Sequence, residues 1–307
     1  MPSSRRRFLK LASTGALAGG FPSLSQAVSE PYPRVGPSRL RLGLAAYSFR
    51  PFFPMFKGKP NPKIAEDKSM TMPDFIRYCA KQNCAAELTS YFFDPKIDDS
   101  YLADCRHIAH VNGVPISGTA VGNNFSHPKN SKEAATQMAY VKQWIDRSAI
   151  LGAPHIRVFA GKHPKEISTE EAERNIIESL EEAGAYAGAK GIFLGIENHD
   201  SISTGTSLLR IVKAVDSKWV GVNLDTGNFA VKDPYPDIEA CAPYAINVQV
   251  KAKLHHGGKR DTDLERVGTI LKKTGYQGHV VLEYEETADP YASIPPILDR
   301  MRQFCDT

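Results

Sequence analysis

Four polar side chains stand at the ends of four successive apolar runs in the second half of the chain. They are Glu197, Asp225, Gln249 and Glu283. Each run is typical of a short buried strand, and a helix-like stretch follows it. Three carboxylates and an amide that meet in space repel one another unless a cation lies between them. Oxygen ligands of this kind suit a hard divalent ion such as Mg²⁺ or Mn²⁺.

Strand-like and helix-like segments alternate along most of the chain. Amphipathic stretches such as 131–151 and 169–190 separate strand-like runs that begin near Leu40, Ala85, Val114, Pro154, Ile192, Trp219, Ala245 and His279. This alternation predicts an α/β fold in which the strands close into a parallel (β/α)8 TIM barrel. The carboxyl ends of the strands of such a barrel form one ring, so the four polar side chains are expected to meet there.

The N-terminal segment has the three regions of an export signal. Residues 4–10 match the twin-arginine pattern, residues 11–21 are weakly apolar, and Ser25-Gln-Ala27 offers small residues before a cleavage site. We therefore expect a twin-arginine signal peptide at 1–27, a linker rich in Pro and Ser at 28–39, and a barrel domain at 40–307. The apolar stretch is too short for a stable membrane anchor.

The positive charge of the chain belongs to this segment. The formal net charge is +4 at pH 7, and residues 1–27 hold four basic side chains (Arg5, Arg6, Arg7 and Lys10) and no acid. The rest of the chain is therefore close to neutral. A near-neutral chain offers no electrostatic argument for nucleic acid or an anionic membrane as a partner.

Five further side chains near strand ends are candidates for substrate binding, namely Glu87, Arg157, His199, Asn228 and Lys251. Arg157 and Lys251 are the only cations expected in the cleft. Arg157 could bind a substrate group or pair with barrel acids, and Lys251 could steady an oxyanion or simply neutralise a carboxylate. A long loop at 50–70 carries aromatic side chains that could stack on a sugar ring or pin the loop to the barrel.

Four motifs resemble the strand ends of the xylose-isomerase-like barrel superfamily, which includes sugar phosphate isomerases and ketose 3-epimerases. The motifs are Glu197-Asn-His199, Leu224-Asp-Thr-Gly-Asn228, Val248-Gln-Val-Lys251 and Leu282-Glu-Tyr-Glu285, and the resemblance spans 40–303. It implies a divalent metal, Mn²⁺ or Mg²⁺, held by Glu197, Asp225, Gln249 and Glu283. The chain departs from the family pattern at Gln249, where histidine is usual, and at Asn228, where a substrate-binding histidine often stands.

The predicted function is a metal-dependent sugar isomerase or epimerase with a small carbohydrate substrate. The cation would hold two sugar oxygens while Glu197 and Glu283 remove and return a proton through an enediolate. A lyase or hydratase of the same superfamily, acting on a keto-sugar or 3-keto-glycoside, is the alternative. A non-catalytic periplasmic carbohydrate-binding protein is an alternative of another class, although a binder gains little from clustered acids. Homo-oligomer formation is left open.

The export signal generates a direct prediction. The mature protein is expected to begin near Val28 and to reside in the periplasm, with the twin-arginine export machinery as a transient partner. Cell fractionation followed by mass measurement of the intact chain checks this. A cytoplasmic protein that still begins at Met1 would contradict it.

Overall fold

The chain folds as a closed barrel of eight parallel strands, in the order β1-β12-β9-β8-β7-β6-β5-β4. The structure is a computed structural model that describes residues 30–62 and 68–306, so the predicted signal peptide lies outside the described residues. The strands are β1 Arg39–Ala45, β4 Ala85–Thr89, β5 Ile116–Ala120, β6 His155–Val158, β7 Phe193–Glu197, β8 Val220–Asp225, β9 Ala245–Lys251 and β12 Gln277–Glu283. The predicted TIM barrel is confirmed, and every predicted strand start lies within two residues of the observed one.

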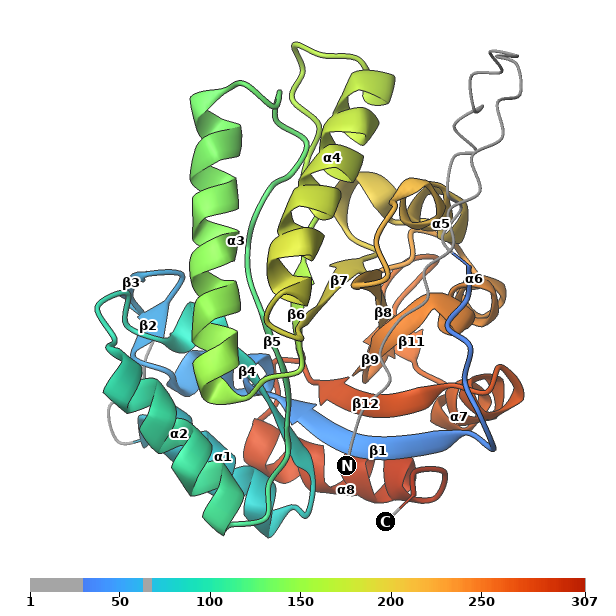
Figure 1. Ribbon diagram of the computed structural model, residues 1–307. Coiled ribbons are helices and arrows are strands. Elements are labelled where there is room, and N and C mark those ends of the chain that lie inside the picture. Colours follow the sequence, from blue (N-terminus) through green and yellow to red (C-terminus); the bar gives the residue numbers. More distant parts are fainter. Residues whose placement is uncertain (1–29, 63–67, 307) are drawn as a thin grey trace, which may run out of the picture.

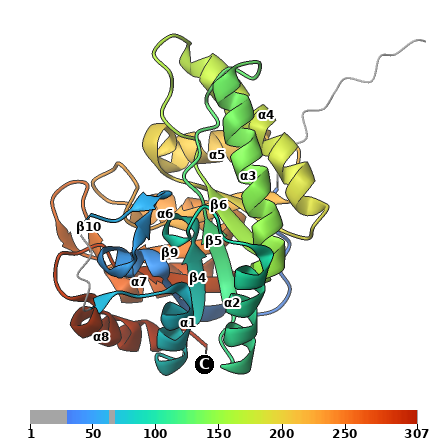
Figure 2. The ribbon, with the colours of Figure 1, turned by 90° about the vertical axis from the view of Figure 1, so that its left-hand side faces the viewer.

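Helices surround the barrel, as Figures 1 and 2 show. They are α1 Met72–Lys81, α2 Asp99–Val111, α3 Lys132–Leu151, α4 Thr169–Gly188, α5 Gly205–Ala214, α6 Tyr235–Cys241, α7 Leu264–Lys273 and α8 Pro290–Arg302. The hydroxyls of Ser131 and Ser168 cap α3 and α4 by accepting backbone N–H groups. None of the helices described here is long and apolar enough to cross a membrane.

The predicted linker is attached to the barrel where the structure describes it. The Tyr32 hydroxyl donates to the carbonyl of Val220 at 3.1 Å, and its ring packs edge-on against Phe193. The Arg34 guanidinium donates to the carbonyls of Pro243 and Ala245. These carbonyls lie at or near the amino ends of strands, so the segment covers the end of the barrel opposite to the predicted site.

The loop after β1 is ordered by its aromatic side chains. It contains the 3₁₀ helix η1 (Ala46–Phe52) and a small hairpin of β2 (Met55–Phe56) and β3 (Lys59–Pro60), while residues 63–67 lie outside the description. Phe52 and Phe53 are buried, and Phe53 stacks on Phe92 of η3 (Ser90–Phe92) with ring centroids 4.4 Å apart. These two rings pin the loop to the barrel and are not free to stack on a sugar.

Two remaining short structures follow the carboxyl ends of strands. The 3₁₀ helix η4 (Asp200–Ile202) follows β7, and the hairpin of β10 (Lys253–Leu254) and β11 (Arg260–Asp261) follows β9. A further 3₁₀ helix, η5 (Ala242–Tyr244), leads into β9. The carboxyl ends of β7 and β9 are therefore each followed by a short element before the next helix.

Candidate functional site

The four predicted side chains lie at or near the carboxyl end of the barrel. Glu197, Asp225 and Glu283 are the last residues of β7, β8 and β12, and Gln249 lies two residues before the end of β9. Strand register pairs Asp225 with Gln249 and pairs Glu283 with Lys251. All of these side chains are buried. The three carboxylates therefore lie together at this end of the barrel and need neutral or positive partners, whereas Gln249 is hydrogen-bonded one layer below them.

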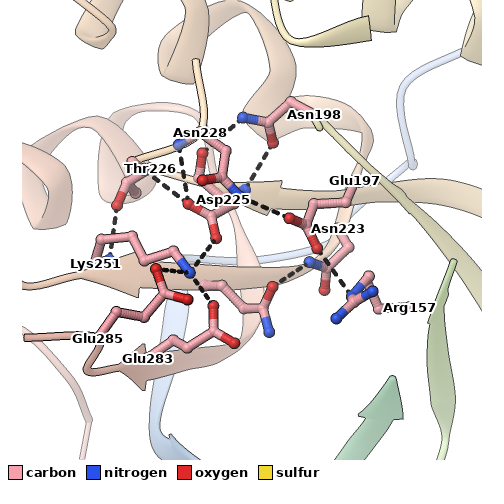
Figure 3. Close-up of polar contacts among 12 residues, drawn as sticks. Arg157, Glu197, Asn198, Asn223, Asp225, Thr226, Asn228, Lys251, Glu283 and Glu285 are labelled. Carbon is pink, nitrogen blue, oxygen red and sulfur yellow. Dashed lines mark hydrogen bonds and ion pairs between the residues drawn. The ribbon is translucent and has the colours of Figure 1, made fainter. Parts of the chain in front are cut away.

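Glu197 is held by two side chains from neighbouring elements. Its Oε2 lies 2.9 Å from Nε of Arg157, and its Oε1 accepts a hydrogen bond from the Asn228 amide at 2.7 Å (Figure 3). Arg157 also donates to the carbonyl of Val121 and lies 3.9 Å from the centre of the Phe159 ring. Burial raises the pKa of the Glu197 carboxyl, and the Arg157 charge opposes this.

Asp225 is fixed by the turn that follows β8. Its Oδ1 accepts from the backbone N–H groups of Gly227 and Asn228 at 2.8 and 3.2 Å. The Asn198 amide exchanges two hydrogen bonds with the Asp225 backbone. The other carboxylate oxygen, Oδ2, faces Nζ of Lys251 at 3.3 Å. Burial raises the pKa of Asp225 to about 6, even though the Lys251 charge acts in the opposite direction.

Lys251 lies among three carboxylates. Its ammonium is 3.3 Å from Asp225 and 3.1 Å from Glu285, and it also contacts Glu283. Figure 3 shows the lysine pointing toward all three acids. Burial lowers the pKa of Lys251, but the three carboxylates outweigh it and raise the pKa well above its usual value. The sequence predicted two roles for Lys251, and the structure shows the second, the neutralisation of carboxylates.

Gln249 belongs to a closed ring of four buried polar side chains. Its Oε1 accepts from the Asn223 amide at 2.7 Å, and its Nε2 donates to Glu87 at 2.7 Å. The Asn247 amide donates to Asn223 at 2.8 Å and to Glu87 at 3.2 Å, which completes the ring. Burial raises the pKa of Glu87 to about 8. Glu87, predicted to bind substrate, instead anchors this ring across the barrel interior.

The four predicted ligands do not fit a divalent metal as they are placed. Both oxygens of Glu197, Oδ1 of Asp225 and Oε1 of Gln249 already have partners. The remaining oxygen of Asp225 and one oxygen of Glu283 face the Lys251 ammonium. Across 30–62 and 68–306, no group of three or more His, Cys, Asp or Glu side chains is placed to hold a metal ion.

A pocket of about 160 Å³ opens above this cluster. It is lined by Tyr47, Lys57, Tyr91, Arg157, Phe159, Glu197, His199, Asn228, Lys251, Glu283 and Glu285. The predicted residues Arg157, His199, Asn228 and Lys251 therefore share one cavity with both proposed catalytic carboxylates. The His199 ring lies 4.5 Å from the Phe159 ring, centre to centre.

Sequence reasoning missed several residues of this site. Lys57 comes from the hairpin after β1 and lies 4.8 Å from the centre of the Tyr91 ring, so Arg157 and Lys251 are not the only cations of the cleft. Asn223 and Asn247 had a readable signal, because each lies two residues before a predicted ligand and so shares its strand face. For Tyr47, Lys57 and Tyr91 the sequence carries no comparable signal.

A known protein family and several solved structures share this architecture. A family model described as the xylose isomerase-like TIM barrel matches residues 80–303, and the chain belongs to this family. No curated protein matches the chain in a sequence search.

Solved structures with the same fold include several sugar epimerases. A D-psicose 3-epimerase with D-tagatose from Clostridium cellulolyticum H10 has a TM-score of 0.69 at 18% identity, over 87% of this chain and 100% of the other. A 3-keto-D-glucoside 4-epimerase from E. coli, in its apo form, has a TM-score of 0.64 at 14% identity, over 86% and 100%. An L-ribulose 3-epimerase has a TM-score of 0.63 at 15% identity, over 86% and 93%. At these identities the likeness establishes the shared fold.

The Arg157–Glu197 pair generates a stability prediction. Arg157→Met leaves a buried carboxylate without its charge partner, so the free energy of unfolding is expected to fall by about 3–5 kcal/mol. The double variant Arg157→Met/Glu197→Gln removes both charges and is expected to recover much of this loss. Denaturant unfolding of each protein measures the effect.

Arg147 provides a matched control, because it also packs on an aromatic ring but is only half-buried. Arg147→Met is expected to change the free energy of unfolding by less than about 1 kcal/mol. A loss of the same size in Arg147→Met and Arg157→Met, or a double variant less stable than the Arg157 single variant, would contradict the assignment.

Proposed function

We propose that the protein is a sugar epimerase or isomerase that moves a proton on a carbon next to a carbonyl. The observation that carries this proposal is that Glu197 and Glu283 line one small polar pocket from strands that are not neighbours in the barrel. Two buried cations, Arg157 and Lys251, line the same pocket. The family and the epimerases that share its fold support the same class of reaction.

The two carboxylates supply the proton transfers in this proposal. One removes the proton from the carbon beside the carbonyl, and the electron pair of the broken C–H bond moves onto the carbonyl oxygen as an enediolate forms. The other returns a proton to the opposite face of the same carbon for epimerisation, or a proton reaches the adjacent carbon for isomerisation. Burial raises the pKa of both Glu197 and Glu283. A higher carboxyl pKa lies closer to neutral pH, where a carboxyl group can both accept and return a proton.

The cations stabilise the charge that develops on oxygen. Arg157 and Lys251 line the pocket as buried positive charges, and a fixed charge beside a developing oxyanion stabilises it strongly where water is excluded. Asn228, held by Glu197 and by the turn after Asp225, offers an amide to a sugar hydroxyl. Tyr91 and Phe159 provide aromatic walls.

A lyase that acts on a keto-glycoside is the second candidate. It shares the first proton abstraction and then expels the group on the neighbouring carbon. A second cavity of about 350 Å³ favours it, because Lys57 and Tyr91 line both this cavity and the site pocket. Tyr140 and Trp144 also line the second cavity, so it offers space and an aromatic surface for an aglycone.

The carboxylate roles predict the behaviour of two variants. Glu197→Gln and Glu283→Gln are each expected to lower turnover by about 10²–10⁴-fold, because an amide cannot accept the proton. Steady-state kinetics on a panel of ketoses and keto-glycosides measures the effect, with circular dichroism to confirm the fold. Glu265→Gln on the exposed face of α7 is the matched control and should keep wild-type rates. The roles are wrong if both site variants retain more than about a tenth of the wild-type rate.

We further propose that the protein is exported and that its substrate is a neutral sugar or glycoside. The twin-arginine pattern supports export. The pocket supports a neutral ligand, because Arg157 and Lys251 are paired with acids and three carboxylates line the cavity. A phosphate group would meet these carboxylates and be repelled.

This substrate proposal predicts a preference between matched sugars. The kcat/KM for a phosphorylated sugar is expected to be at least about tenfold lower than for the free sugar, a difference of about 1.4 kcal/mol. Measurements on matched pairs of free and phosphorylated ketoses decide it. A marked preference for the phosphorylated sugar would overturn the proposal and would point to Lys57 as the partner of the phosphate, since Lys57 lines the pocket.

A further inference from the structure

A backbone hydrogen bond and close packing, as well as charge, determine the position of Lys251. It is the last residue of β9, and its backbone N–H donates to the Thr226 hydroxyl at 3.1 Å. Gly227 leaves room for the lysine stem, because a Cβ at that position would lie 2.4 Å from Cγ of Lys251. The side chain is 6% exposed, so the ammonium is presented to the acids and not to bulk water.

The geometry around the ammonium matches its bonding capacity. An ammonium has three N–H donors, and three carboxylates surround this one: Asp225, Glu283 and Glu285. These three residues are called the carboxylate cluster below. Without a cation, three acids this close would repel one another strongly in a buried site. The lysine supplies that cation from within the chain.

Gln249, the fourth side chain of the predicted metal site, is already hydrogen-bonded to other residues. In the hydrogen-bonded ring, Gln249 uses its oxygen for Asn223 and its nitrogen for Glu87. In the other amide orientation, its oxygen would face Glu87 and not the carboxylate cluster. Gln249 therefore offers no free oxygen toward Lys251 in either orientation.

We propose that the ammonium of Lys251 is the resident cation of the carboxylate cluster and takes the place of the divalent metal that the sequence predicts. The catalytic meaning of this inference rests on the proposed function, because a metal-independent proton transfer is claimed only if the pocket turns over a sugar. The ammonium then acts as a fixed single charge beside the developing oxyanion. The structural part of the inference, a built-in cation, stands independently of the reaction.

The test compares wild type with Lys251→Met, which keeps an unbranched stem and removes the charge. Wild type is expected to contain less than about 0.1 divalent ion per chain, and its Tm is expected to be unchanged by EDTA or by millimolar Mn²⁺ or Mg²⁺, since a ligand shifts Tm only when it binds the folded state. Lys251→Met is expected to have a lower Tm that Mn²⁺ restores. Its Kd for Mn²⁺ by calorimetry should be at least about tenfold tighter than that of wild type, because the repelling ammonium is gone.

Lys213→Met is the matched control, since Lys213 is exposed on α5 and packs over the Tyr244 ring. This variant should show no Tm response to Mn²⁺. A stoichiometric divalent ion in wild type, or a fall of its Tm on treatment with EDTA, would overturn the inference. If Lys251→Met does not fold, the wild-type metal content and the EDTA response decide the question alone.

Activity separates this inference from the proposed function. Sugar turnover that survives EDTA supports both. Turnover that is lost with EDTA and restored by Mn²⁺ keeps the proposed function and overturns the built-in cation. A metal-free wild type that turns over no sugar, together with rescue of the Lys251→Met Tm by Mn²⁺, keeps the built-in cation and overturns the proposed function.

Discussion

The ion pairs between Lys251 and three carboxylates are the interaction on which the site depends. Parallel strands bring Asp225 and Glu283 to one end of a closed barrel, and Glu285 lies two residues after the end of β12. Buried carboxylates at such distances are unfavourable without a compensating charge. Lys251 provides this charge from the neighbouring strand, so the carboxylates can stay buried and ionised close to a pocket.

A second layer of polar side chains supports this cluster from below. The ring of Glu87, Asn223, Asn247 and Gln249 connects β4 with β8 and β9 across the barrel interior. Interiors of such barrels are usually filled by branched apolar side chains. Here buried amides take their place, and each ring member limits the rotation of the next, which holds the strand ends in a defined geometry.

The fold and the location of the candidate site could be predicted from the sequence, because both depend on local patterns. Apolar runs such as Phe193–Glu197 and the caps at Ser131 and Ser168 are readable from neighbouring residues. The partners of the site residues were not readable in this way. The Gln249–Glu87 hydrogen bond joins residues 162 positions apart, and Lys57 reaches the pocket from a loop whose path no periodicity describes.

Deuterium exchange tests the central claim, that the pocket moves a proton beside a carbonyl. The protein would be incubated in D₂O with ketoses and keto-glycosides, and the substrates and products analysed by NMR and mass spectrometry. The account predicts deuterium at the carbon next to the carbonyl, with loss of the signal in Glu197→Gln and Glu283→Gln. Turnover without any solvent deuterium at that carbon would contradict it.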